Sequence, residues 1–360
     1  LIVEDDPFIG CVTTTVDEQD AGATPGAPGG VGFSLREAIN WAASLPGRET
    51  VCFDPALAGQ TITFTLGVLP ILPIGGLRIA GGGVMTIDFG ALSYGFRTRI
   101  ANELHGLRLT GVAAGGVAKI VIGGNNVIVS ECEIFAGGGA GIAWDQTLSS
   151  GPGTNLDVLD NDLHDNETDG IRIAPLNAGD VGAEILRNRI RDNGGSGIDA
   201  SRIGNGTVVG RNLVHGNGSQ GITIGSDNGD VINNTVAFNG GDGVRFVDCG
   251  CAPDHRFWNN LVFDNAGVGL NGFAGGGGDS DGKNFVFGND LGGTLGNVNL
   301  LGSDQVNTLD PLLEADLELA PASPCRDSGV NVGGTPDANG RDTGTFYGTA
   351  FDIGAWEGPR

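Results

Sequence analysis

Charged side chains recur at one position of a repeated Gly-Ile pattern, two residues after the glycine. Arg172 lies in DGIRI, Asp199 in SGIDA and Arg245 in DGVRF, and Asp169 and Asp242 directly precede the glycine. An arginine there could neutralise the carboxylate of an acidic sugar, and a carboxylate could act as base, acid or Ca²⁺ ligand. The simpler alternative is a surface ion pair between Arg172 and Asp199.

A second group of side chains shares position four of the pattern Asn-x-(Ile/Leu/Val)-x-x-Asn. His164, Arg191 and His215 occupy it in three successive copies, and Arg189 stands at position two of the middle copy. Two histidines beside arginines suit proton abstraction next to a carboxylate whose charge is neutralised. A polar, solvent-facing strand explains the same residues equally well.

The segment CGCAPDHR holds two further candidates for substrate binding, His255 and Arg256. It is a long insertion between two copies of the repeat, and it would form a wall beside a groove. Cys249 and Cys251 with His255 could instead bind a metal ion, but no second Cys/His pair completes a tetrahedral site. A disulfide is the favoured interpretation.

Two short segments have the alternating oxygen ligands of calcium loops. DSDG supplies Asp279 and Asp281, and DANGRD supplies Asp337, Asn339 and Asp342. The rest of an EF-hand loop is missing, so the alternatives are a structural Ca²⁺ ion and a plain Asx turn.

The elements that must position these residues form a repeat. The Asn pattern occurs six times at intervals of 22–27 residues: NDLHDN, NRIRDN, NLVHGN, NTVAFN, NLVFDN and NFVFGN. Degenerate earlier copies are CEIFAG from Cys132 and GLRLTG from Gly106. Each unit holds three short strands bounded by Asn or Gly, which predicts an all-β fold, a parallel β-helix. We expect Asn to suit the left-handed corner and to form side-chain ladders, with Gly at the next corner.

The two ends of the chain differ from the repeat, as the caps of a solenoid do. FSLREAINWAA has apolar residues at helical spacing, with Ser34 and Glu37 placed for a capping box, so a helix is expected over 34–44. The predicted organisation is an N-terminal cap over 1–60, coils over 61–305 and a turn-rich C-terminal cap over 306–360.

Composition limits the function classes. The chain has 43 acidic and 19 basic residues and a formal charge of −24, which argues against nucleic acid as a partner. The same charge would repel an acidic polysaccharide unless arginines or Ca²⁺ reversed the field locally. No apolar run is long enough to span a membrane. Six cysteines in a chain with two lysines favour disulfides in an oxidising compartment.

The terminal motifs carry a resemblance to a known group. VTTTVDEQD, FSLREAINWA and TITF resemble the N-terminus of secreted bacterial right-handed β-helix proteins with an SLREAI-type helix. NTLDPLLEADLELAPASPCRDSGVN and FDIGAWE resemble the anchor-type module that follows the coils in that group. The resemblance implies the fold and export to the cell surface or medium. Some members of the group resemble pectate-lyase-like enzymes, and others resemble adhesive proteins.

One further likeness argues against hydrolysis. ETDGI, with Asp169, is similar to a stretch of polygalacturonase-type hydrolases, but the next coil reads GSGID and lacks their paired aspartate. The leading hypothesis is therefore an extracellular protein that binds and processes an acidic polysaccharide as a lyase or epimerase. The alternative is a non-catalytic structural or adhesive protein, with self-association through its open strand edges.

Overall fold

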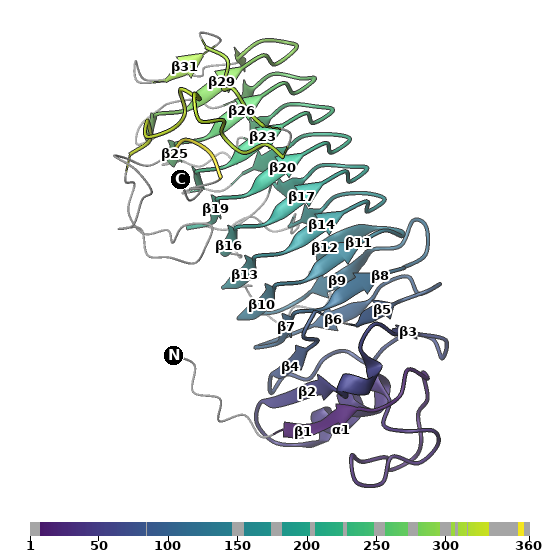
Figure 1. Cartoon of the computed structure of the whole chain (residues 1–360). Helices are drawn as coiled ribbons and strands as arrows, with labels where there is room; N and C mark the ends of the chain where they lie inside the picture. Colours follow the sequence, from purple (N-terminus) through teal and green to yellow (C-terminus); the bar gives the residue numbers. More distant parts are fainter. Residues whose placement is uncertain are drawn as a thin grey trace. The chain divides into compact units, whose positions relative to one another are not determined.

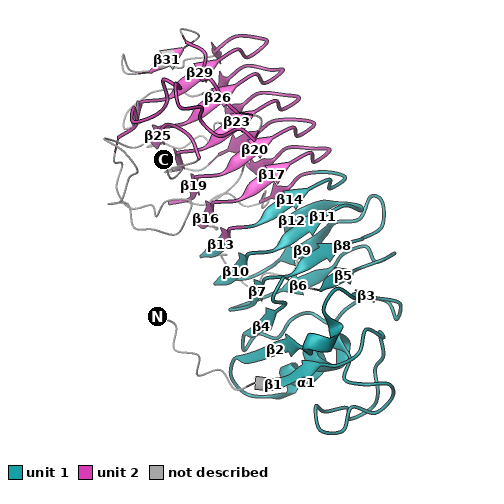
Figure 2. Ribbon diagram, in the orientation of Figure 1, with its two compact units in different colours: residues 1–157, 161–168 teal, residues 158–160, 169–360 magenta. Residues whose placement is uncertain are grey.

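The chain folds into two compact units that both consist of parallel strands (Figures 1 and 2). Unit 1 holds residues 1–157 and 161–168, and unit 2 holds residues 158–160 and 169–360. The structure, a computed structural model, describes residues 8–83, 85–145, 155–173, 182–201, 206–225, 229–247, 256–272, 280–295, 304–306, 309–314, 316–330 and 352–355.

The strands of unit 1 belong to three parallel sheets, here named X, Y and Z. Sheet X contains, in order, β1 (Phe8–Val12), β2 (Glu49–Phe53), β4 (Leu77–Ala80), β7 (Glu103–His105) and β10 (Val127–Ser130). Sheet Y contains β3 (Thr61–Thr63), β5 (Thr86–Asp88), β8 (Arg108–Thr110), β11 (Glu133–Phe135) and β14 (Asp162–His164). Sheet Z contains β6 (Phe96–Thr98), β9 (Ala118–Ile122) and β12 (Ala140–Trp144). β13 (Leu156–Leu159) crosses the boundary between the units.

Unit 2 repeats the same three sheets. Sheet X contains β16 (Ala183–Leu186), β19 (Val208–Gly210), β22 (Asp230–Ile232), β25 (Arg256–Trp258) and β28 (Ser280–Gly282). Sheet Y contains β17 (Arg189–Arg191), β20 (Leu213–His215), β23 (Thr235–Ala237), β26 (Leu261–Phe263), β29 (Phe285–Phe287) and β31 (Gln305–Val306). Sheet Z contains β15 (Ile171–Arg172), β18 (Ile198–Ala200), β21 (Ile222–Ile224), β24 (Val244–Phe246), β27 (Leu270–Asn271) and β30 (Thr294–Leu295). The parallel β-helix predicted from the repeat is confirmed.

The N-terminal helix also forms as expected. α1 (Leu35–Ser44) begins after Ser34, whose hydroxyl accepts from the N–H of Glu37 while the Glu37 carboxylate accepts from the Ser34 N–H. Leu35, Ala38, Ile39 and Ala42 lie on its buried face. A short 3₁₀ helix, η1 (Pro55–Leu57), follows β2. Strands β1 and β2 precede residue 61 yet pair within sheet X, so the N-terminal segment supplies strands as well as a helix.

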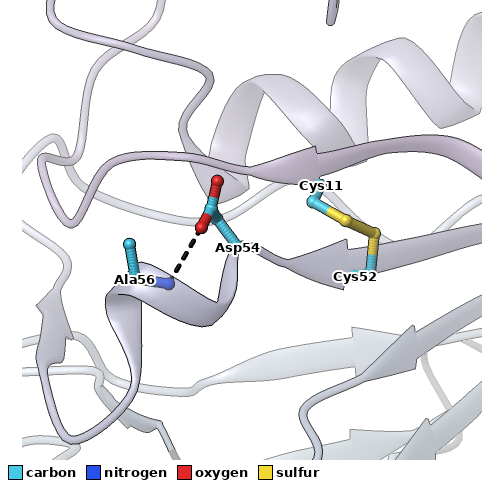
Figure 3. The surroundings of a disulfide bond; sticks show 4 residues. All are labelled: Cys11, Cys52, Asp54 and Ala56. Atoms are coloured by element: carbon cyan, nitrogen blue, oxygen red, sulfur yellow. Dashed lines mark hydrogen bonds between the residues drawn. A yellow bond between two sulfur atoms is a disulfide. The ribbon is translucent and has the colours of Figure 1, made fainter.

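The cysteines behave differently from one another. Cys11 and Cys52 form a disulfide between β1 and β2, next to the turn in which Asp54 accepts from the Ala56 N–H (Figure 3). Cys132 and Cys325 are free and buried, and burial raises the pKa of each thiol to about 12. The expectation of disulfides holds for one pair and is wrong for these two residues. Cys249 and Cys251 lie outside the described residues.

The corners of the coils contain two buried asparagine ladders. In unit 2 the side chain of Asn212 donates to Asn234, which donates to Asn260, each at 3.0 Å. A second ladder joins Asn193, Asn217, Asn239, Asn265 and Asn289. The ladder is confirmed, but its conformational reason was wrong. The left-handed residue is the one before each ladder asparagine, such as Arg211 at φ 58°.

The glycine that precedes each of the strands β15, β18, β21, β24 and β27 is required by space. A Cβ on Gly221 would lie 2.3 Å from a Val236 methyl carbon and 2.6 Å from the Gly243 carbonyl oxygen. Gly170, Gly197, Gly243 and Gly269 meet the same obstacles in their own coils. None of these glycines has a positive φ. We expected these glycines to turn the chain. The structure shows that a glycine is needed there because the next coil packs too closely to leave room for a side chain.

The C-terminal segment of unit 2 is turn-rich where it is described, and it covers one face of sheet Y. Phe263 and Phe285 pack with Cys325 and Ile353 in a buried cluster. The Ala355 N–H donates to the Thr235 hydroxyl at 3.0 Å, which ties the segment to β23. Among the described residues, no helix has the length and apolarity needed to cross a membrane.

Candidate functional site

The outer side of sheet Z in unit 2 carries one row of polar side chains. The strand register places Arg172 beside Asp199, Asp199 beside Thr223, and Thr223 beside Arg245. Asn271 continues the row beside Arg245. The intervening residues, Ile198, Ile222 and Val244 among them, are fully buried inside the coil. The predicted placement of Arg172, Asp199 and Arg245 in one row is thus confirmed, while their chemical roles stay predictions.

A second polar row borders the first at the corner where the chain enters sheet Z. It consists of the residues before Gly170, Gly197, Gly221 and Gly243, which are Asp169, Ser196, Gln220 and Asp242, whereas Val268 precedes Gly269. Asp169 accepts from the Ser196 N–H at 2.8 Å, and the Ser196 hydroxyl lies 3.3 Å from Gln220 Oε1. These contacts follow the same coil-to-coil order as the strands. The two rows therefore line one strip of the surface of unit 2.

Asp169 is the electrostatically unusual member of this strip. Burial raises its pKa above the ordinary 3.8, and the negative charge of Asp199 raises it further. The Ser196 N–H and the Arg172 guanidinium act in the opposite direction without cancelling the rise. A carboxyl group that holds its proton to higher pH, next to an ionisable carboxylate and an arginine, can deliver or take up a proton during a reaction.

Of the two arginines of the row, Arg172 is partly exposed and Arg245 is exposed. No ion pair joins Arg172 or Arg245 to a carboxylate of the described residues, although Arg172 is close enough to Asp169 to influence its titration. Asp199 instead accepts from the Ser201 N–H at 3.1 Å. The alternative of a simple Arg172–Asp199 surface ion pair is therefore not what the described part of the strip contains.

Asp242, in contrast, is fully engaged. One carboxylate oxygen accepts from the Val268 N–H at 2.9 Å, and the other accepts from the Asn271 side-chain amide at 2.7 Å. This carboxylate fixes the far end of the strip and orients Asn271 beside Arg245. Its expected role in substrate binding would be indirect.

The predicted His/Arg group falls on three strands that are consecutive in the order of sheet Y, β14, β17 and β20, with His164 in unit 1 and Arg191 and His215 in unit 2. Arg191 and His215 are neighbours in register on sheet Y of unit 2, and an Arg191 guanidinium nitrogen lies 3.4 Å from an Asp192 carboxylate oxygen. The row then continues from His215 to Ala237 and Phe263, which the C-terminal segment covers.

His164 belongs to unit 1, where it lies in a charged cluster of its own. Its Nδ1 is 2.7 Å from an Asp165 carboxylate oxygen, and its Nε2 is 3.4 Å from Glu133. Arg108 donates to the other Glu133 oxygen at 2.6 Å and lies over the Phe135 ring, which stacks on His164. The surroundings of His164 are those of a paired surface histidine.

Arg189 and Arg256 are also placed apart from the strip. Arg189 is exposed on sheet Y and lines a hollow of about 260 Å³ together with Arg187, Arg211, Asp316 and Glu318. Arg256 lies on sheet X, where its Nε donates to Asp230 at 2.7 Å. Neither residue converges with Arg172, so we leave both out of the candidate site.

The remaining candidates are not placed. His255, Asp279, Asp337, Asn339 and Asp342 lie outside the described residues, and only the backbone of Asp281 is described, paired with Phe257. In the part of the chain that the structure describes, no group of three His, Cys, Asp or Glu side chains could hold a metal ion. Calcium in these segments stays a prediction.

Sequence reasoning missed two sets of residues. Ser196 and Gln220 complete the corner row, and their shared position before the glycine would have identified them. Glu133 in unit 1 was missed because position two of the copy CEIFAG, which is in register, was not weighed, and Arg108 was missed because the copy GLRLTG was aligned one residue out of register. The structure pairs Glu133 with both Arg108 and Asp162, so the copy begins at Leu107.

Comparison with known proteins supports the architecture. The sequence matches the family model described as right handed beta helix region over residues 76–200 and 175–289. No curated protein sequence matches the chain.

Two of the solved structures that are similar to this one share low sequence identity with it. Pectate lyase Pel9A shares 14% identity, with 98% of this chain and 97% of that chain covered at a TM-score of 0.58. The Azotobacter vinelandii mannuronan C-5 epimerase AlgE4 A-module shares 17% identity, with 71% and 73% covered at a TM-score of 0.53. At these identities the likeness shows the fold alone.

Proposed function

Because the chain belongs to the right-handed β-helix family, we propose that it is an extracellular protein that binds and processes an acidic polysaccharide. The reaction would be β-elimination or epimerisation at the carbon next to the sugar carboxylate. The observation that carries the proposal is the cluster of Asp169, Arg172 and Asp199 on the outer side of sheet Z. A pectate lyase and a mannuronan epimerase with this fold are compatible with it. The Cys11–Cys52 disulfide favours an exported protein.

Each residue of the cluster has a role in this chemistry. Arg172 would bind the sugar carboxylate and stabilise the negative charge that develops when the adjacent C–H proton is removed. Asp199 would accept that proton. Asp169, with its raised pKa, would supply a proton. In β-elimination the electron pair forms a C=C bond, the glycosidic C–O bond breaks and Asp169 protonates the leaving oxygen. In epimerisation a proton returns to the same carbon from the opposite face.

Arg245 extends the site along the strip. It lies two strands from Asp199 and is exposed. Strands of a parallel sheet are ~4.8 Å apart, so Arg245 would meet a neighbouring sugar of the same chain. An exposed arginine in an acidic protein would draw the polymer onto the strip.

The test is turnover on a panel of polyuronates, with Ca²⁺ and with EDTA. Formation of unsaturated uronates is followed by ultraviolet absorbance, and epimerisation by solvent deuterium entering the polymer. We expect Arg172→Ala to lower kcat/KM by ~100-fold or more and Arg172→Lys to retain part of the activity. Arg326→Ala, in the C-terminal segment, is the matched control.

Two outcomes would overturn the proposal. One is turnover that Arg172→Ala leaves unchanged. The other is an absence of turnover on every polyuronate under both ionic conditions. If the protein also assembles into polymers by light scattering, the structural or adhesive alternative replaces the enzyme.

A further inference from the structure

A second pocket lies in unit 1, beside the N-terminal helix. It has a volume of about 470 Å³, within the range of small-ligand pockets, ~300–1,000 Å³. One wall is the face of α1 formed by Glu37, Asn40, Trp41 and Ser44. The opposite wall is the segment 19–23. The helical spacing of three and four residues explains why these side chains share a face, since the opposite face packs into the core.

Hydrogen bonds hold the two walls of the pocket in place and leave other polar groups of the pocket for a ligand. The Asp20 N–H donates to the Glu37 carboxylate at 2.8 Å, which ties the segment 19–23 to the helix. Asp20 in turn accepts from the Gly30 N–H. Both walls are therefore positioned before a ligand arrives, so binding would cost little ordering entropy.

Three side chains of the pocket could contact a ligand. Gln19 is exposed, and Asn40 and Trp41 are partly exposed. None of the three side chains makes a hydrogen bond to any described residue. Together they offer one flat aromatic face and two amide groups that each donate and accept.

The charge of the pocket selects the ligand. Asp20 and Glu37 place two carboxylates in its wall, in a chain with a formal charge of −24. An anionic sugar would be repelled. A neutral sugar ring has an apolar face that can lie on an indole and an edge of hydroxyl groups that amides recognise. We propose that this pocket binds an uncharged mono- or disaccharide unit, with Trp41 as the platform and Gln19 and Asn40 as the hydroxyl contacts.

This binding site is independent of the proposed catalytic strip. It lies in unit 1, and the strip lies wholly in unit 2. Its ligand is uncharged, whereas the ligand proposed for the strip is anionic. The inference goes beyond the proposed function, because it predicts recognition of neutral sugars even if the chain proves to have no activity on acidic polymers.

The experiment is isothermal titration calorimetry on the full chain with cellobiose, xylobiose and mannobiose. Digalacturonate and choline serve as the anionic and the cationic probe. We expect at least one neutral disaccharide to bind, and Trp41→Ala to weaken it by ~10-fold or more. Asn40→Ala should weaken the same ligand by a smaller factor. Arg172→Ala should bind it as the unsubstituted chain does.

Several results would overturn the inference. Binding of choline with no binding of any neutral disaccharide would make the pocket a cation site. Binding of a disaccharide that survives both Trp41→Ala and Asn40→Ala would place the ligand elsewhere. The absence of a binding isotherm with every neutral disaccharide would also contradict the proposal. If Trp41→Ala unfolds, as seen by circular dichroism, Gln19→Ala and Asn40→Ala decide the question.

Discussion

At the scale of single residues, Asp169 illustrates how a functional group can cost stability. Its carboxyl is half-buried, and both burial and Asp199 raise its pKa above 3.8. A raised carboxyl pKa favours folding when the group is protonated, and this contribution is lost as the pH rises through the raised value. At neutral pH the folded state therefore carries the cost of an ionised, poorly solvated carboxylate.

We predict that Asp169→Asn separates stability from activity. The amide oxygen can still accept from the Ser196 N–H, while the charge near Asp199 is removed. The free energy of unfolding at pH 7, obtained from thermal unfolding, should be unchanged or higher by at most ~1 kcal/mol, because solvent screens the site. Turnover of the polyuronate should fall by ~100-fold or more. A clear loss of stability with activity intact would show that Asp169 is a structural residue.

The pKa of Glu133, in unit 1, is shifted in the opposite direction to that of Asp169. Burial alone would raise its pKa, but the hydrogen bond and charge of Arg108, with a contribution from His164, hold it below 4.5. Such a group adds stability above pH 4.5, and this stability is lost as the pH falls through the lowered value.

Glu133→Gln should therefore destabilise the protein at pH 7 by up to ~1 kcal/mol, since the side chain is one-third exposed and solvent weakens its ion pairs. The difference between the variant and the unsubstituted chain should shrink near pH 3. Melting temperatures at both pH values check this. Glu131→Gln, whose side chain is 65% exposed, is the control and should melt like the original chain at either pH.

At the scale of the element, the corner determines the coil more than the strand does. Most strands of unit 2 contain only two or three residues, too few to be stable alone. The buried asparagines satisfy backbone groups that the tight corner would leave unpaired. Asn234, for example, accepts from the Asn212 N–H and donates to the Val209 carbonyl.

Replacement of one ladder residue should cost far more than an ordinary polar substitution. In Asn234→Ala, the Asn212 N–H, the Asn212 amide and the Val209 carbonyl all lose a partner while buried. The Asn212 amide keeps its hydrogen bond to the Ile185 carbonyl, so two groups are orphaned. At ~1–3 kcal/mol for each of them, we expect a loss of at least ~2 kcal/mol, measured by chemical denaturation. Thr294→Ala, exposed at the end of sheet Z, should change stability by less than ~0.5 kcal/mol. Equal effects of the two changes would mean that the ladder adds no stability.

The repeat made the elements and the candidate strip predictable from sequence. Because side chains alternate along a strand, the spacing from each glycine was enough to place Arg172, Asp199 and Arg245 in one row. The reason for the glycine was not predictable, since it depends on a methyl group of the next coil. The packing of the C-terminal segment on sheet Y was not predicted, because it brings Phe263 into contact with the cluster of Ile353, and no sequence repeat relates these two residues.

At the scale of the whole molecule, stability is expected to be distributed along the coils. In a solenoid each coil contacts mainly its neighbours, so a perturbation acts locally instead of on one global core. The two units can therefore respond separately to a change confined to one of them. The Cys11–Cys52 disulfide lies in unit 1 and links residues 41 positions apart in the first two strands of sheet X.

We predict that removal of this disulfide destabilises unit 1 selectively. In the chain-entropy model, a cross-link over this separation contributes ~4 kcal/mol. The double variant Cys11→Ala, Cys52→Ala should expose unit 1 to limited proteolysis first, with early cuts mapped by mass spectrometry to residues before 157. Substitution is preferable to a reductant, which would also act on any other disulfide. Cys132→Ala, which removes a buried free thiol from the same unit, controls for the loss of a cysteine side chain. Early cuts confined to unit 2, or a cleavage pattern that matches the unsubstituted chain, would contradict the prediction.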